Sequence, residues 1–307
     1  MTALPRLRAA FAALVLLAAP ACAKPAPAAA AHPHARAATD ADPALWVVHQ
    51  GPATIYLFGT IHVLKPGLTW FDEAVRQAFD RSDELKLEIV EPDPQAMAGL
   101  VQTQGMAAAG PTLTDKLPPR ERPALRRWMA RIGMQPAAYD RMRPWLAASF
   151  LEVQSLIQVG YDPASGPEHV LTAAATAAGK PVSGLETVEQ QIGFFAGLSD
   201  GAQVAMLDET LDEMPTLQRQ MGRMADEWAA GRSDLIAREL NDGITRSPEA
   251  MQALLIDRNR RWADWIKARL ARPGTVFIAV GAGHLAGPTS VQAELARRGV
   301  RAERVNY

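Results

Sequence analysis

Two histidines near opposite ends of this 307-residue chain follow the same short pattern. His62 comes three residues after Gly59, and His284 comes three residues after Gly281. Each pair lies at the end of an apolar, β-branched run that predicts a buried strand. Histidine is a common metal ligand and general base, and glycine lets the backbone turn sharply or a ligand approach. The repetition predicts one shared functional site, whereas a single such histidine is more often a structural residue bonded to a backbone carbonyl.

Two glutamates are candidate partners for these histidines. Glu88 lies in the apolar run Leu85 to Val90, where a buried carboxylate needs a partner. The alternative is a polar sheet face on which Glu88 and Lys86 are solvated. Glu186 lies where a short strand leads into a helix, so it either serves chemistry or favours the helix N-terminus.

Two histidines with one or two carboxylates match the ligands of a catalytic Zn, Mn, Co or Fe ion that keeps a position open for water. Such an ion lowers the pKa of the water and polarises a carbonyl group. Arg258, Asn259 and Arg261 follow on a predicted helix, where they either anchor a substrate carboxylate or oxyanion, or form a solvated face. His49 and His169 are interpreted as structural residues.

Other classes of function lose support. The chain has no His-Glu-x-x-His, Gly-x-Ser-x-Gly, P-loop or Gly-x-Gly-x-x-Gly motif, which disfavours standard zincins, serine hydrolases and nucleotide-binding enzymes. The formal net charge of -1 gives no reason to expect nucleic acid as a partner. The single cysteine, Cys22, lies in the expected leader and so cannot be a core nucleophile, and a chain with one cysteine has no internal disulfide.

The N-terminal residues predict export. Residues 1–23 have the basic, apolar and small-residue order of a signal peptide, and the apolar part is too short for a permanent membrane span. Cleavage after Ala23 is favoured over lipidation of Cys22, because the leucine usual in a lipoprotein box is missing. We expect a periplasmic protein or, if Cys22 is lipidated, an outer-membrane lipoprotein. Residues 24–42, rich in Ala and Pro, predict a disordered linker that includes His32 and His34, and residues 43–307 predict the folded domain.

Alternating and apolar segments place the motifs on an α/β fold. Strands are predicted at residues 45–49, 54–58, 85–90, 182–183, 275–280 and 301–305. Helices are predicted after Thr69 as a cap, and over 120–132, 144–158, 168–178, 201–240, 248–270 and 289–298. Each Gly-x-x-His motif is thus followed by a helix and a strand. We expect a small central sheet in which these two units lie side by side, with a large helical insertion between them.

With these motifs together, the chain resembles the TraB/GumN family, relatives of the Tiki proteases in a superfamily with erythromycin esterase and ChaN-like proteins. The resemblance covers nearly all of the folded part. It rests on the segments Leu45-Trp46, Tyr56 to His62, the Glu88 strand, Gly179 to Val182, Gly184 to Thr187, Arg258-Asn259 and Val280 to Leu285.

The resemblance implies an α/β core and a metal-dependent hydrolase site. Tiki relatives are described as divalent-metal proteases, so a peptide or protein is the implied substrate and Mn, Co or Zn the implied cofactor. On this likeness His62 and His284 are metal ligands and Glu88 is a further ligand or the general base. Glu186 and Arg258 join Glu88 at the catalytic site.

Two functions follow from these observations. One is an exported metal-dependent hydrolase that activates water for attack on an amide. The other is a binding protein that holds a peptide, a metal or haem in the same pocket without turnover, as ChaN-like relatives suggest. Contact with a membrane is expected only through a lipid anchor at Cys22.

Overall fold

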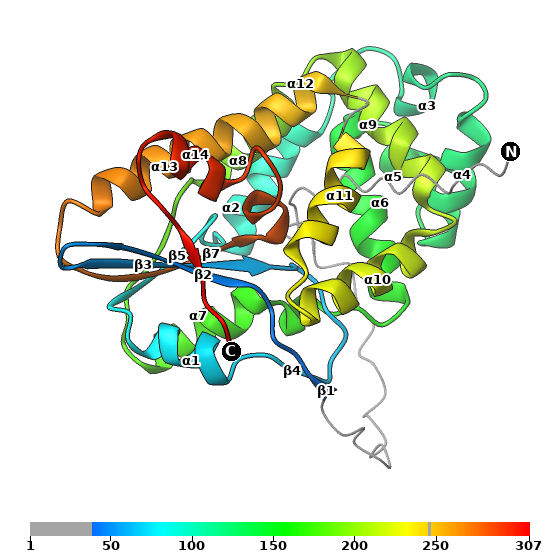
Figure 1. The fold of residues 1–307 in the computed structure, drawn as a ribbon. Helices are drawn as coiled ribbons and strands as arrows, with labels where there is room; N and C mark the ends of the chain where they lie inside the picture. Colours follow the sequence, from blue (N-terminus) through cyan, green and yellow to red (C-terminus); the bar gives the residue numbers. More distant parts are fainter. Residues whose placement is uncertain (1–38, 245–246) are drawn as a thin grey trace, which may run out of the picture.

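The computed structural model of the chain describes residues 39–244 and 247–307 and combines a sheet with a helical part (Figure 1). The sheet lies at one end between helices, and the other end consists of helices alone. The predicted α/β fold with a central sheet and a large helical insertion is confirmed.

The central sheet has six strands in the order β6-β5-β7-β3-β2-β8. The four strands β6, β5, β7 and β3 run parallel, whereas β2 is antiparallel to both of its neighbours. Two further strands, β1 and β4, pair in parallel beside the sheet. The bounds are β1 Thr39–Asp40, β2 Leu45–Gln50, β3 Ala53–Thr60, β4 Leu68–Thr69, β5 Glu84–Leu87, β6 Val182–Gly184, β7 Gly274–Gly281 and β8 Glu303–Arg304.

The α-helices within the described residues cover both sheet faces and build the helical part. They are α1 Glu73–Asp80, α2 Pro94–Leu100, α3 Leu113–Lys116, α4 Arg122–Arg131, α5 Pro136–Tyr139, α6 Pro144–Gln158, α7 Pro167–Ala177, α8 Val188–Ala196, α9 Asp200–Glu213, α10 Leu217–Ala229, α11 Ser233–Ile244, α12 Pro248–Met251, α13 Asp257–Arg269 and α14 Val291–Arg297. Short 3-10 segments, η3 Pro163–Ser165 and η5 Ala282–Leu285, and π segments, η2 Val101–Gly105 and η4 Gln252–Ile256, complete the chain.

Strand β7 shows why the apolar run near the C-terminus becomes a central strand. Val276, Ile278 and Val280 share one apolar cluster with residues of α13 and α14. Phe277 and Ala279 belong to the other cluster, with residues of α1 and α7. Because alternate side chains of a strand point to opposite faces, a strand covered on both sides must be apolar throughout.

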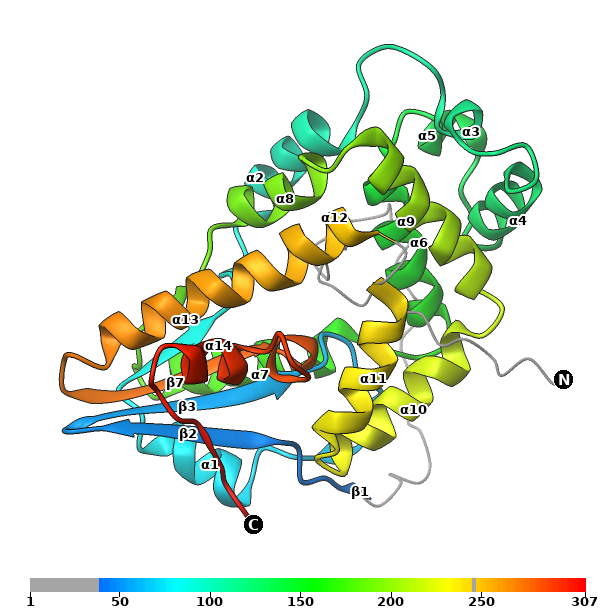
Figure 2. The same cartoon turned by 45° about the horizontal axis from the view of Figure 1, so that its top comes forward.

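Helix α13 connects the helical part to the sheet. Figure 2 shows it running along the sheet and ending in the turn that leads to β7. The π segment η4 directly precedes it, so the predicted helix over 248–270 is one helical path with an irregular turn inside it. Such π turns often lie beside functional residues.

Several predicted elements agree closely with the structure, and others need correction. The hairpin β2–β3, helix α6 and strand β7 lie where the sequence predicts them. Thr69 as a helix cap is wrong, because Thr69 belongs to β4 and α1 begins at Glu73 after Asp72. The helical tract predicted over 201–240 divides into the three helices α9, α10 and α11.

The predicted signal peptide and residues 24–38 of the linker lie outside the described residues. Thr39 and Asp40 pair with Leu68 and Thr69, and Ala41 is buried, so described structure begins before residue 43. Over the residues that the structure describes, we find no helix that combines the length and apolar character needed to span a membrane.

Candidate functional site

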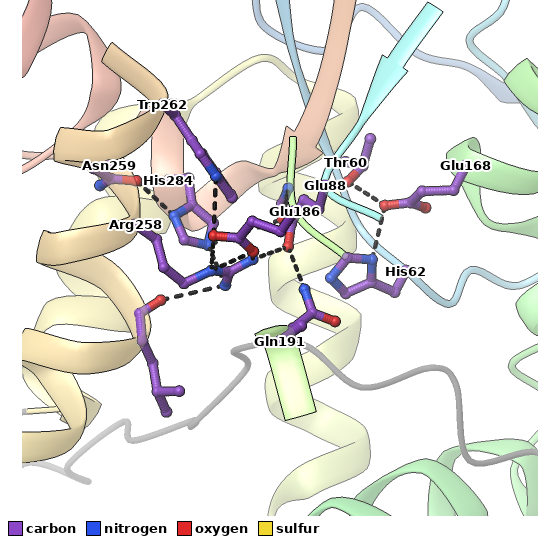
Figure 3. Close-up of polar contacts among 12 residues, drawn as sticks. Thr60, His62, Glu88, Glu168, Glu186, Gln191, Arg258, Asn259, Trp262 and His284 are labelled. Carbon is purple, nitrogen blue, oxygen red and sulfur yellow. Dashed lines mark hydrogen bonds and ion pairs between the residues drawn. The ribbon is translucent and has the colours of Figure 1, made fainter. Parts of the chain in front are cut away.

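The two Gly-x-x-His motifs end on neighbouring strands. Strands β3 and β7 pair in parallel register, with Gly59 opposite Val280 and Thr60 opposite Gly281. A Cβ atom built on Gly281 would lie 3.6 Å from His62 Nε2 and 3.7 Å from His284 Cδ2. Both imidazoles therefore border one small space, as the shared site requires (Figure 3).

Glu88 lies at the centre of this space. It follows β5, which pairs with β7, and only 5% of the residue is exposed. Its carboxylate accepts hydrogen bonds from Gly281 N at 2.6 Å, Arg258 Nη2 at 2.6 Å and Gln191 Nε2 at 3.1 Å. The interpretation of Glu88 as a solvated residue on a polar sheet face is wrong.

Position 281 favours glycine because the Glu88 carboxylate comes close to the backbone there. An added Cβ atom would lie 3.1 Å from Glu88 Oε1, closer than ordinary van der Waals contact. The glycine thus leaves its N–H open to the carboxylate and leaves space between the two histidines. Close approach of a side chain, rather than a sharp turn, explains this glycine.

Arg258 joins the two glutamates. Its side chain is fully buried, and Nε donates to Glu186 Oε1 at 3.1 Å and Oε2 at 3.0 Å, while Nη2 donates to both glutamates. Nη1 donates to the Leu254 carbonyl of the preceding π segment at 3.3 Å. Glu186 also accepts from Trp262 Nε1 at 3.0 Å. The interpretations of Arg258 as a solvated residue and of Glu186 as a helix-terminus charge are wrong, because each side chain is held in this network.

His284 is held with its Nδ1 proton pointing away from Glu88. Its Nδ1 lies 2.6 Å from Asn259 Oδ1, and Asn259 Nδ2 donates to Thr289 O at 2.7 Å, which fixes the amide orientation. Arg258 Nη1 lies 3.1 Å from His284 Nε2 and can only donate, so Nε2 is the acceptor and Nδ1 carries the proton. Burial and the charge of Arg258 lower the pKa of His284 to about 3.

His62 has a different partner. Its Nδ1 lies 2.7 Å from Glu168 Oε1, and Thr60 Oγ1 donates to the same oxygen. Burial lowers the pKa of His62, but the charge of Glu168 and the hydrogen bond to it prevail and raise that pKa to about 9. The two histidines therefore lie in opposite electrostatic environments, one favouring the imidazolium and the other the neutral ring.

The charge of Glu88 is stabilised despite its burial. Burial alone would raise the pKa of this carboxyl, but the charge of Arg258 and smaller contributions from both histidines hold it well below the usual range. The Gly281 N–H bond acts in the same direction. The site consequently keeps a buried carboxylate ionised in a space lined by two imidazoles.

The types of donor in this space suit a divalent metal ion. Each histidine directs Nδ1 to an oxygen acceptor, which is the arrangement usual for metal-bound histidines, whose other nitrogen holds the metal. However, no three His, Cys, Asp or Glu side chains of the described part of the chain are grouped closely enough, as they stand, to hold an ion. Arg258 Nη1 occupies the lone pair of His284 Nε2. The residues fit a metal by chemistry, but His284 must give up this hydrogen bond and His62 must give up the proton on its Nε2.

Other candidate residues lie apart from this centre. His49 is exposed and contacts Thr54, and His169 lies 3.5 Å from Glu91 at the surface.

The three polar residues singled out on α13 differ in their surroundings. Asn259 is bonded to His284 and Arg258 to the two glutamates, so neither is available to anchor a substrate carboxylate. Arg261 is half-exposed and lies over the Phe194 ring, so it alone of the three residues singled out on α13 faces solvent.

Four residues of the network are absent from the sequence-based prediction. All four contact the predicted residues, and three of them, Glu168, Gln191 and Trp262, lie on helices outside the Gly-x-x-His motifs. The Gly-x-x-His motif contains Thr60, so its position next to a candidate ligand was the available signal. Glu168 begins an ordinary apolar helix and gives no such signal.

Comparison with known proteins identifies the family of the chain. A protein of Treponema pallidum (strain Nichols), described as an uncharacterized protein, is 22% identical over 266 residues, which cover 80% of this chain and 78% of the relative. No solved structure matches the chain. The profile of the TraB/PrgY/gumN family matches residues 44–304, the whole sheet with its helical insertion. The chain therefore belongs to the TraB/PrgY/gumN family.

Proposed function

We propose that this protein is an exported, metal-dependent hydrolase that cleaves peptide bonds. The observation that carries the proposal is the common orientation of the two histidines. Each has its Nδ1 bonded to a separate oxygen acceptor, and both rings border the space beside Gly281 and Glu88. Structural histidines at two unrelated strand ends need not share a space or a buried carboxylate.

In this proposal His62, His284 and Glu88 hold the metal, which is Mn, Co or Zn. A divalent ion supplies positive charge that polarises a carbonyl group and lowers the pKa of a water molecule. Glu88 supplies a permanent negative charge, because Arg258 and the Gly281 N–H keep it ionised. Glu186 neutralises Arg258 and holds it in place, so its role is to position rather than to react.

The partly exposed side of the site belongs to His62. About a fifth of the His62 side chain is solvent-accessible, 21%, compared with 6% of the His284 side chain. In this proposal a substrate carbonyl reaches the centre from this side, and His62 acts as a metal ligand only, because Glu168 holds its Nδ1. The peptide as substrate class follows from the likeness to Tiki relatives, and export follows from residues 1–23.

Metal binding and peptide cleavage test the proposal together. The purified protein, stripped with a chelator, is titrated with Mn²⁺, Co²⁺ and Zn²⁺ by calorimetry and then incubated with a peptide library. We expect one ion per chain and cleavage that depends on it, and both should be lost in His62→Ala and His284→Ala. His169→Ala is the matched control, because this histidine lies at the surface next to Glu91.

Two results would contradict the proposal in different ways. If the His62 and His284 variants bind metal as the unchanged protein does, the metal site is wrong. If the protein binds metal through these histidines but cleaves no peptide, the same pocket serves a binding protein without turnover, which is the other function that the sequence suggests.

A further inference from the structure

The segment before α7 is built against the His62 loop. Asp162 N donates to Leu64 O at 2.9 Å, and the two residues form an isolated antiparallel bridge. Gly166 lies so close to the backbone of His62 that an added Cβ atom would overlap the His62 carbonyl oxygen. The backbone of this segment is therefore fixed relative to His62 before any side-chain contact is considered.

Glu168 extends from this segment to His62. One oxygen, Oε1, accepts from both Thr60 Oγ1 and His62 Nδ1. Within the described residues no arginine or lysine is paired with Glu168, and its only cationic partner is His62. A carboxylate with 23% of its side chain exposed is thus devoted to orienting one imidazole.

The two histidines differ in the acceptor that holds them. His284 faces the neutral amide oxygen of Asn259, whereas His62 faces a carboxylate. A carboxylate acceptor makes the opposite ring nitrogen a stronger electron donor than an amide acceptor does. The ring of His62 is consequently both fixed and more basic at Nε2.

We propose that Glu168 is a positioning residue for the reaction centre, which holds the Nδ1–H of His62 so that Nε2 faces Glu88 and the space beside Gly281. Thr60 restrains the carboxylate in turn. This inference rests on the proposed function for the role of His62, but the orientation of the ring is measurable without any activity. It assigns to a residue on α7 an effect on chemistry that takes place at the ends of β3 and β7.

Two readouts test this role. The first is nuclear magnetic resonance of the ring protons of His62 in metal-free protein, because a proton shared with a carboxylate resonates far downfield and exchanges slowly. We expect this signal in the unchanged protein, its loss in Glu168→Ala and a smaller downfield shift in Glu168→Gln, which keeps an acceptor oxygen without the charge. Glu91→Gln is the matched control, since Glu91 lies at the surface, 3.5 Å from His169.

The second readout is the affinity for Co²⁺. Loss of an outer partner of a metal-bound histidine lowers metal affinity by about 10–100-fold. We expect this loss in Glu168→Ala, a smaller loss in Glu168→Gln and none in Glu91→Gln. Thermal unfolding of each variant separates this effect from a general loss of structure, and Glu168→Gln serves if Glu168→Ala does not fold.

The outcomes separate this inference from the proposed function. A Glu168→Ala protein that keeps the downfield His62 signal and full Co²⁺ affinity overturns the positioning role. If the unchanged protein binds no metal, the proposed function fails while the ring-proton signal still decides the role of Glu168. Loss of both the signal and the affinity in Glu168→Ala supports the inference.

Discussion

Replacement of Arg258 by methionine tests whether the buried network is held together by charge. Methionine retains much of the side-chain volume but leaves Glu88 and Glu186 without their shared cation, and only 6% and 4% of these side chains are exposed. Removing one partner of a buried ion pair costs about 3–5 kcal/mol. For a chain of this size that corresponds to a fall in melting temperature of roughly 10 °C.

The destabilisation should depend on pH in a defined direction. In the unchanged protein the pKa of Glu88 is lowered by folding. The ionised Glu88 therefore contributes to the free energy of unfolding above pH 4.5, the ordinary pKa of a glutamate. This contribution is lost as the pH falls towards the pKa of Glu88 in the folded protein. Without Arg258, burial dominates and raises that pKa above 4.5. The variant must then lose stability as the pH rises above 4.5, and its deficit should be larger at pH 7.5 than at pH 4.5.

Urea unfolding followed by tryptophan fluorescence at both pH values measures this effect. Arg261→Met is the control, because Arg261 is half-exposed and its pair with Glu186 is worth about 0–1 kcal/mol. Adding Glu88→Gln and Glu186→Gln to Arg258→Met should recover a large part of the loss. The reasoning is refuted if Arg258→Met is no less stable than Arg261→Met, or if its deficit is equal at both pH values.

Two further predictions concern residues outside the centre. Gly166→Ala should lower the free energy of unfolding by about 1–3 kcal/mol, because the new methyl group meets the His62 backbone. Gly201→Ala has open space around the new methyl group and should raise the free energy of unfolding by up to ~1 kcal/mol, as measured in urea. Equal effects of the two alanines would contradict the packing argument. Burial raises the pKa of Glu152 to about 8, so stability should fall as the pH rises from 4.5 to 8. Glu152→Gln still accepts the hydrogen bond from Thr210. This variant should remove the fall of stability with pH and be more stable than the unchanged protein at pH 8 by roughly 2–4 kcal/mol. If the fall of stability with pH is the same in the variant, Glu152 is already ionised in the folded protein.

The sequence predicts those parts of the fold that depend on local pattern. Strand β7 has a continuous apolar run and helix α6 has apolar residues at helical spacing, and the bounds of both agree with the structure to within a residue. The prediction of Thr69 as a cap is wrong because Thr69 pairs with Asp40, almost thirty positions earlier, and this pairing outweighs its capping tendency. Pairing between distant segments leaves no trace in a local window.

The same distinction applies to the site. The repeated Gly-x-x-His motif suffices to predict that His62 and His284 share a space, because parallel neighbouring strands end at the same edge. Which cation would neutralise Glu88, and which acceptor would fix His62, depends on where α13 and α7 dock. Arg258 and Glu168 owe their contacts to this docking, so spacing along the chain carries no information about them.

The position of β7 between β5 and β3 has a consequence for the timing of folding. Strand β3 leaves the ribosome early, but the strand that pairs along its whole length follows only about 210 residues later. Until then the first half of the sheet has an open edge and the histidine loop has no partner. The chain therefore cannot finish its core while it is being synthesised, and the reaction centre is among the last parts to form. Completion of the sheet, and with it any chemistry at the site, therefore waits until nearly all of the chain has been released.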